Sequence, residues 1–134
     1  MTRLPALLAA SLLLLSGSAA IAKPKLDPEA RLAKALEGRV AGEPVDCIQL
    51  SRVNSTRIID RTAIIYDAGS ILYVNRPRAG GERLDRHDTL VTRTFSSQLC
   101  RVDVVRLFAT GSRMETGLVF LGDFVPYRRV RGSK

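Results

Sequence analysis

Tryptophan is absent from this sequence of 134 residues, histidine occurs once, cysteine occurs twice, and aromatic residues make up 5%. One histidine and two cysteines are too few for a structural zinc site, which takes four such ligands. Cys47 and Cys100 are also too far apart for a C-x-x-C redox centre. Neither the G-x-S-x-G elbow of serine hydrolases nor the G-x-x-x-x-G-K phosphate loop occurs. We therefore expect no metal and no cofactor, and the sequence assigns no catalytic residue.

The composition is that of a small, basic, globular protein. Its length permits one compact domain and is too short for a (β/α)8 barrel or a two-domain enzyme. Hydrophobic residues make up 46% of the chain, which is enough to build a core and excludes a disordered protein. Lysine and arginine outnumber aspartate and glutamate by 21 to 13, and the formal net charge is +8.

The first 22 residues have the three parts of a secretory signal. Arg3 gives a positive start, an apolar run follows over residues 7–15, and small residues stand at 20–22 before a cleavage site. We therefore expect the mature chain to begin near Lys23.

A membrane anchor is the alternative interpretation of this stretch. Spanning a bilayer takes about 20 apolar residues. Pro5, Ser11 and the Ser-Gly-Ser run at 16–18 interrupt the sequence before that length is reached. We therefore expect a periplasmic or secreted bacterial protein with no transmembrane segment after cleavage.

In an oxidising compartment the two cysteines are expected to pair with each other. A Cys47–Cys100 disulfide would close a loop of about 50 residues, which contributes about 4 kcal/mol of stability by chain entropy. Cys47 would then have no thiolate to act as a nucleophile. The pair is predicted to stabilise the fold.

The pattern predicts one helix followed by short strands. Asp27 and Pro28 are suited to the N-cap and first position of a helix, and Gly38 is suited to end it. From Cys47 onward, β-branched and aromatic residues gather in short runs separated by turn residues. The predicted strands are 57–60, 63–66, 71–75, 89–95, 103–108, 118–121 and 124–127.

The predicted fold class is mainly β, because no helix-length segment links one strand to the next. We expect a small antiparallel sheet, curled into a sandwich or partial barrel, with one short N-terminal helix. Its core should include Ile64, Ile65, Leu72 and Val74. The expected organisation is a signal peptide (1–22), an N-terminal helix and linker (23–45), a disulfide-linked β-rich domain (46–128) and a basic, frayed C-terminal tail (129–134).

Several short motifs follow one another at characteristic spacings. They are Cys47-Ile48, Asn54-Ser55-Thr56, Ile59-Asp60, Ile64-Ile65-Tyr66, Tyr73-Val74-Asn75, Leu99-Cys100 with Asp103, and Leu121 to Pro126. Their order resembles a family of small exported bacterial proteins known only as a domain of unknown function. The resemblance covers about 46–127, and each motif is short.

Members of that family commonly have four cysteines, whereas this chain lacks the two expected near 80–84 and 115–117. The resemblance implies that the missing cysteines paired with each other, which leaves Cys47 bonded to Cys100. It leaves the conformation of the loop around Gly80 open. It implies no substrate, cofactor or catalytic residue.

Three polar residues are candidates for a functional site. Asp60 and Asp103 lie at strand ends, where a carboxylate next to arginine either specifies the fold or takes part in chemistry. His87, the single imidazole, lies in a charged loop with Asp85 and Asp88, which suits a solvated surface better than a metal site because arginines flank it.

The positive charge comes mostly from arginine, whose guanidinium binds phosphates and carboxylates with two hydrogen bonds. Anionic envelope components or an acidic protein partner are therefore the expected partners. Nucleic acid is not expected, because the charges are scattered and aromatic residues are few. The preferred interpretation is an exported, non-enzymatic binding or structural protein; the alternatives are a small hydrolase with a site on loop 76–88, or an inhibitor-type protein.

Overall fold

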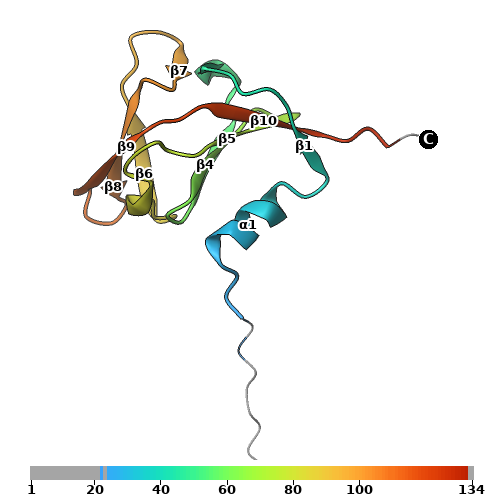
Figure 1. Cartoon of the computed structure of the whole chain (residues 1–134). Coiled ribbons are helices and arrows are strands. Elements are labelled where there is room, and N and C mark those ends of the chain that lie inside the picture. The colour runs from blue at the N-terminus through green and yellow to red at the C-terminus, as the bar shows by residue number, and fades with distance from the viewer. Residues whose placement is uncertain (1–21, 23, 133–134) are drawn as a thin grey trace, which may run out of the picture.

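The computed structural model describes residue 22 and residues 24–132 of the chain. The signal peptide predicted for 1–22 lies outside the described residues, apart from Ala22. The described part contains one α-helix, ten short strands and two 3-10 turns (Figure 1). Their bounds are α1 (Pro28–Ala35), β1 (Arg39–Ala41), β2 (Cys47–Gln49), η1 (Leu50–Arg52), β3 (Ser55–Ile59), β4 (Ala63–Asp67), β5 (Ile71–Asn75), η2 (Gly81–Arg83), β6 (Asp88–Thr92), β7 (Gln98–Cys100), β8 (Val104–Ala109), β9 (Glu115–Phe120) and β10 (Phe124–Arg129).

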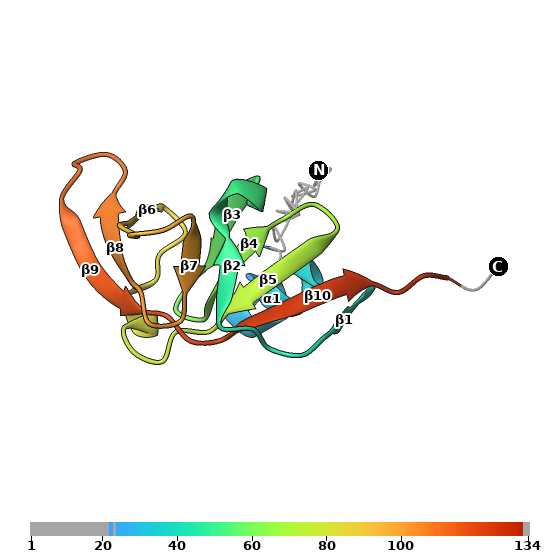
Figure 2. The ribbon, with the colours of Figure 1, turned by 90° about the horizontal axis from the view of Figure 1, so that it is seen from above.

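The strands form three antiparallel sheets. A five-stranded sheet has the order β1-β10-β5-β4-β3, a three-stranded sheet has the order β6-β8-β9, and β2 pairs with β7 in a two-stranded ribbon. Figure 2 shows the β8–β9 hairpin at the opposite end of the molecule from β1. The predicted fold class, mainly β and antiparallel with one short helix, is confirmed, and the described strands do not close into a barrel.

The main core lies between the five-stranded and three-stranded sheets. Ile64 and Tyr66 of β4 contribute to it from one side, and Val105 and Leu107 of β8 from the other. The cluster comprises Ile48, Ile58, Ile64, Tyr66, Leu84, Leu99, Val105, Leu107, Val119, Leu121 and Phe124. Each of these side chains is nearly or fully removed from water, which is the dominant favourable contribution to folding.

The helix α1 covers the other face of the five-stranded sheet. Leu32, the one buried residue of α1, packs with Ile65 of β4 and Val74 of β5 in a second, smaller core. Because alternate residues of a strand point to opposite faces, β4 is apolar on both sides. All four core residues predicted from the sequence, namely Ile64, Ile65, Leu72 and Val74, are buried.

The ends of α1 are formed as the sequence predicts. The Asp27 side chain accepts a hydrogen bond from the Ala30 amide, and Pro28 occupies the first turn. Gly38 adopts φ +73°, the left-handed conformation that glycine accommodates after a helix. Arg76, just after β5, donates two hydrogen bonds to Glu29. Hydrogen bonding to Arg76 lowers the pKa of the Glu29 carboxyl below its usual value.

Among the described residues, Asn75 is the one polar residue that is fully buried. Its Nδ2 donates to the Gly122 carbonyl at 2.6 Å, and its Oδ1 accepts from the Gly122 amide at 3.0 Å. These two bonds satisfy the backbone amide and carbonyl of Gly122, which lies in the segment between β9 and β10. A Cβ at Gly122 would lie 2.3 Å from the Arg76 carbonyl oxygen, so this close approach requires glycine.

Several predictions of local structure need correction. The strand predicted for 118–121 is the longer β9, which begins at Glu115. Strands β1, β2 and β7 were not predicted; each has only three residues, and each is held by a distant partner in the sequence. The predicted strand 89–95 ends at Thr92. The C-terminal tail begins later than expected, because β10 continues through Arg128 and Arg129, which pair with β1.

Replacing Tyr66 by phenylalanine is expected to raise the free energy of unfolding by about 1 kcal/mol. The Tyr66 hydroxyl is buried and has no hydrogen-bond partner among the described residues. A buried hydroxyl that has lost its water is destabilising, so its removal relieves a cost while the ring keeps its contacts. Urea unfolding of the two proteins at pH 7 gives the difference.

The same pair of proteins has a defined pH dependence. Burial raises the pKa of Tyr66 above its ordinary value of 10. Above pH 10 the unfolded chain loses this proton while the folded chain retains it. The free energy of unfolding of the unsubstituted protein therefore falls by about 1.4 kcal/mol per pH unit because of this group. The advantage of Tyr66→Phe should therefore grow between pH 10 and 11, and a constant difference would contradict the assigned burial.

Candidate functional site

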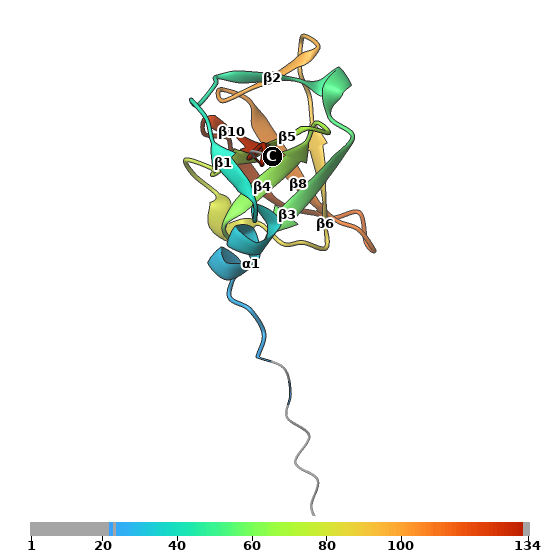
Figure 3. The ribbon, with the colours of Figure 1, turned by 90° about the vertical axis from the view of Figure 1, so that its right-hand side faces the viewer.

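Cys47 and Cys100 form a disulfide, as predicted. They are direct cross-strand neighbours in the β2–β7 ribbon, with an S–S distance of 2.04 Å and a Cα–Cα distance of 4.0 Å. The ribbon lies across one end of the two larger sheets, at the top of Figure 3. No cysteine of the described chain is free, so neither sulfur is available as a nucleophile or metal ligand.

Asp60 lies in the turn between β3 and β4 and connects three segments. Its Oδ2 accepts from Arg31 of α1 at 3.2 Å, and its Oδ1 accepts from the Arg86 amide at 2.8 Å. The Arg86 guanidinium lies 3.8 Å from the same carboxylate. This carboxylate therefore holds the helix and the segment before β6 against the β3–β4 turn.

Asp103 lies in the turn between β7 and β8. Its Oδ2 accepts a hydrogen bond from the Cys100 amide at 2.7 Å, and its own amide donates to the Cys100 carbonyl at 2.9 Å. The nearest arginine in sequence, Arg101, instead contacts Asp46 and Asp123. Asp103 therefore stabilises the turn next to the disulfide by backbone hydrogen bonds.

His87 is exposed, and its ring nitrogen Nε2 accepts a hydrogen bond from the Nε of Arg86 at 3.2 Å. The neighbouring Thr110 hydroxyl donates to the backbone carbonyl of His87 and not to its ring. Within the described residues this imidazole has no hydrogen bond to a carboxylate that would orient it as a general base.

The structure thus brings the predicted residues together in two separate places. Asp60 and His87 are linked through Arg86, and Asp103 lies beside the disulfide. No group of three or more histidine, cysteine, aspartate or glutamate side chains suited to a metal occurs in the described part of the chain. In both places, the contacts of these side chains hold neighbouring segments of the chain together.

A different surface stands out, which the sequence analysis did not single out. We call it the outer face: the side of the β6-β8-β9 sheet that points away from the core. The register places Val91, Arg106 and Leu118 in one row across the three strands, and Val104 beside Phe120 in the next. The members of the outer face are Val91, Val104, Arg106, Phe108, Leu118 and Phe120.

The outer face is apolar but open to solvent. Val91, Leu118 and Phe120 are 37%, 41% and 38% exposed. The five-stranded sheet has α1 on its corresponding side, whereas no element of the described chain packs on the outer face. Uncovered clusters of large apolar side chains of this kind are typical of interaction surfaces.

Arginines lie over the two aromatic rings of the outer face. The guanidinium carbon of Arg106 is 5.7 Å from the Phe108 ring centre, and that of Arg78 is 5.8 Å from the Phe120 ring centre. Arg106 also pairs with Glu115. Arginine and aromatic side chains are the residue types enriched at the energetic centres of protein interfaces.

Comparison with protein-family models, curated proteins and solved structures finds no match to this chain. Among the described residues, no helix has the length and hydropathy to cross a bilayer.

Proposed function

We propose that this chain is an exported, non-enzymatic binding protein whose outer face docks on an acidic protein partner of the cell envelope. The sequence supports export through its predicted leader, and the Cys47–Cys100 disulfide is compatible with an oxidising compartment. The resemblance to a family of exported proteins supports the same location and supplies no activity.

The observation that carries the proposal is the uncovered outer face itself. Leu118 and Phe120 offer apolar area that water solvates poorly, and the Arg78 guanidinium, which has no ion pair among the described residues, adds positive charge to it. A partner with acidic residues around an apolar patch would match both properties.

Two other occupants fit this face less well. A second copy of the chain, docked by the same face, would set the arginines of one copy against those of the other, which is repulsive. An anionic lipid surface would attract Arg78 but repel the Glu115 carboxylate, which lies opposite Phe108 on β9. A protein partner can place a carboxylate against Arg78 and a cationic side chain against Glu115.

The test is photocrosslinking in the native envelope. A photoreactive residue replaces Leu118 on the outer face or, as a matched control, Val40, which is 56% exposed on β1. We expect a discrete adduct with one acidic protein from position 118 and none from position 40. The purified partner should bind the mature chain. Arg78→Gln, which removes the charge, or about 0.5 M salt, which screens it, should weaken that binding about tenfold.

Three results would overturn the proposal. They are equal adducts from both positions, no protein adduct from position 118, and binding to the purified partner that is unchanged by Arg78→Gln. Vesicles containing anionic phospholipid provide the remaining comparison. Salt-sensitive retention on these vesicles, with no protein adduct, would replace the protein partner with a lipid surface.

A further inference from the structure

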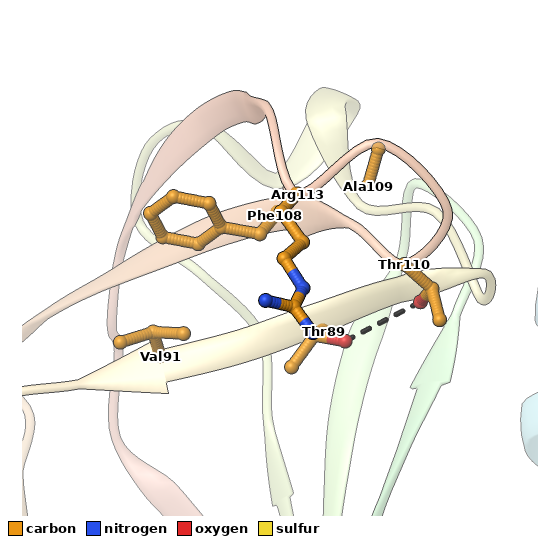
Figure 4. Close-up of a pocket in the computed structure, with 6 residues that line it drawn as sticks. All are labelled: Thr89, Val91, Phe108, Ala109, Thr110 and Arg113. Carbon is orange, nitrogen blue, oxygen red and sulfur yellow. Dashed lines mark hydrogen bonds between the residues drawn. The ribbon is translucent and has the colours of Figure 1, made fainter.

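A hollow of about 390 Å³ lies at the end of the outer face, next to the β8–β9 turn (Figure 4). Thr89 and Val91 of β6 line one side, Phe108 and Ala109 of β8 the other, and Thr110 and Arg113 of the turn complete it. A volume of this size is at the small end of ligand-binding pockets. It accommodates a group of about the size of an aromatic side chain.

Arg113 reaches into this hollow from the turn. In Figure 4 its guanidinium lies between the Phe108 ring and Thr89. Unlike Arg76, Arg101 and Arg106, whose side chains pair with carboxylates, Arg113 has no hydrogen bond or ion pair from its side chain to any described residue. Its five N–H donors are therefore available to a ligand in a geometry that fits a carboxylate with two parallel bonds.

Arg113 also adopts an unusual backbone conformation. Its φ is +56°, in the left-handed region that residues with a Cβ avoid. This backbone conformation is part of the turn that places the side chain over the hollow. It is unfavourable for residues other than glycine and asparagine.

The two threonine hydroxyls add little donor capacity to the site. Thr110 donates its single proton to the His87 carbonyl, and its oxygen lies 3.3 Å from the Thr89 oxygen. Thr89 must therefore be the donor in that contact, because the Thr110 proton is already engaged. The guanidinium is thus the principal donor facing a ligand.

The charge near the hollow favours a ligand with one negative charge. Arg106 pairs with Glu115, whereas Arg113, at this end of the outer face, has no ion pair among the residues that the structure describes. A dianionic phosphate would have oxygens left without donors in a site with one guanidinium, whereas a carboxylate uses both of its oxygens. The apolar wall of Val91, Phe108 and Ala109 suits a ring or branched aliphatic group beside that carboxylate.

We infer that this hollow binds an organic carboxylate attached to an apolar group of about the size of a phenylalanine side chain. The inference rests on the proposed function in one respect. In the acidic protein partner, the group that fills the hollow would be an apolar side chain next to a carboxylate. The binding of a free small carboxylate is nevertheless a property of the hollow alone.

The test uses N-acetylphenylalanine as the probe and amide chemical shifts of the mature, disulfide-bonded protein as the readout. We expect shifts that saturate with a dissociation constant of about 1 mM and that centre on Thr89, Phe108, Ala109 and Thr110. N-acetylphenylalanine amide lacks the carboxylate and N-acetylglycine lacks the ring. Each should bind at least about tenfold more weakly.

Arg113→Asn removes the guanidinium, and asparagine tolerates the left-handed backbone, so the turn should be retained. It should weaken N-acetylphenylalanine binding at least about tenfold. The matched control is Arg61→Asn in the β3–β4 turn, which removes the same charge from a second described non-glycine residue at positive φ, +53°. This control should bind like the unsubstituted protein.

Absence of shifts at about 10 mM probe would overturn the inference, as would equal binding of the amide or equal weakening by Arg61→Asn. Phenyl phosphate binding about tenfold more tightly than the carboxylate would also overturn it. The result is separable from the proposed function, because crosslinking can fail while the small carboxylate binds. Conversely, a protein adduct from position 118 can form when the hollow binds nothing.

Discussion

Replacing Cys47 and Cys100 together by alanine is expected to lower the free energy of unfolding by about 4 kcal/mol. The disulfide connects residues 53 positions apart and therefore restricts a large part of the unfolded chain. The folded chain loses little, because the two residues already pair across β2 and β7 through their backbones. Since small domains are stable by only about 5–15 kcal/mol, this is a large fraction of the total.

Urea unfolding of the oxidised protein and of the Cys47→Ala, Cys100→Ala variant measures this difference, which should appear as a midpoint lower by about 3 M. A thiol reductant should bring the native protein close to the variant and leave the variant itself unchanged. A loss below about 1 kcal/mol would mean that the closed loop does not limit the unfolded state in the way that the chain-entropy argument requires.

Phe124→Ala is expected to lower the free energy of unfolding by about 3–5 kcal/mol, because it leaves a cavity that the sheets cannot collapse to fill. Phe124 is fully buried, and its ring meets that of Tyr66 at a centre-to-centre distance of 5.7 Å and an angle of 65°. Its backbone is fixed as well, through two hydrogen bonds with Val45.

The outer face supplies the matched control for this experiment. Phe120 is the same residue type on β9, the strand that precedes β10 in the chain, but it is 38% exposed. Phe120→Ala should cost about 1 kcal/mol or less, since its ring is already in contact with water. Thermal or urea unfolding of both variants gives the comparison. Similar losses from the two substitutions would contradict the assignment of Phe124 to the core and Phe120 to the surface.

The sequence was sufficient to predict the long strands and the helix, because their signals are local. In β4 and β5, β-branched residues run between turn residues, and the helix α1 has both an N-cap at Asp27 and a glycine at its end. The short strands β1, β2 and β7 carry no comparable signal. Their three residues become strands only because a distant segment supplies the hydrogen-bonding partner.

The disulfide was predictable from two cysteines and a presumed oxidising compartment, whereas the outer face was not identified. Its signal is present in β9, where Leu118, Val119 and Phe120 are three apolar residues in succession, so apolar side chains must lie on both sides of the strand. The sequence does not say which side meets the core. That depends on the register with β8, which places Val119 inside and its two neighbours outside.

The pairing of β1 with β10 joins the first strand of the domain to the last, with Arg39 opposite Arg129. Strand β5 also pairs with β10, so β1 and one edge of β5 depend on the same segment for their hydrogen bonds. A chain that emerges residue by residue from a ribosome can therefore pair β3, β4 and β5 in order, but it cannot complete this sheet before β10 has emerged. Unpaired strand edges are prone to aggregation, so protection of this sheet depends on the arrival of its last strand.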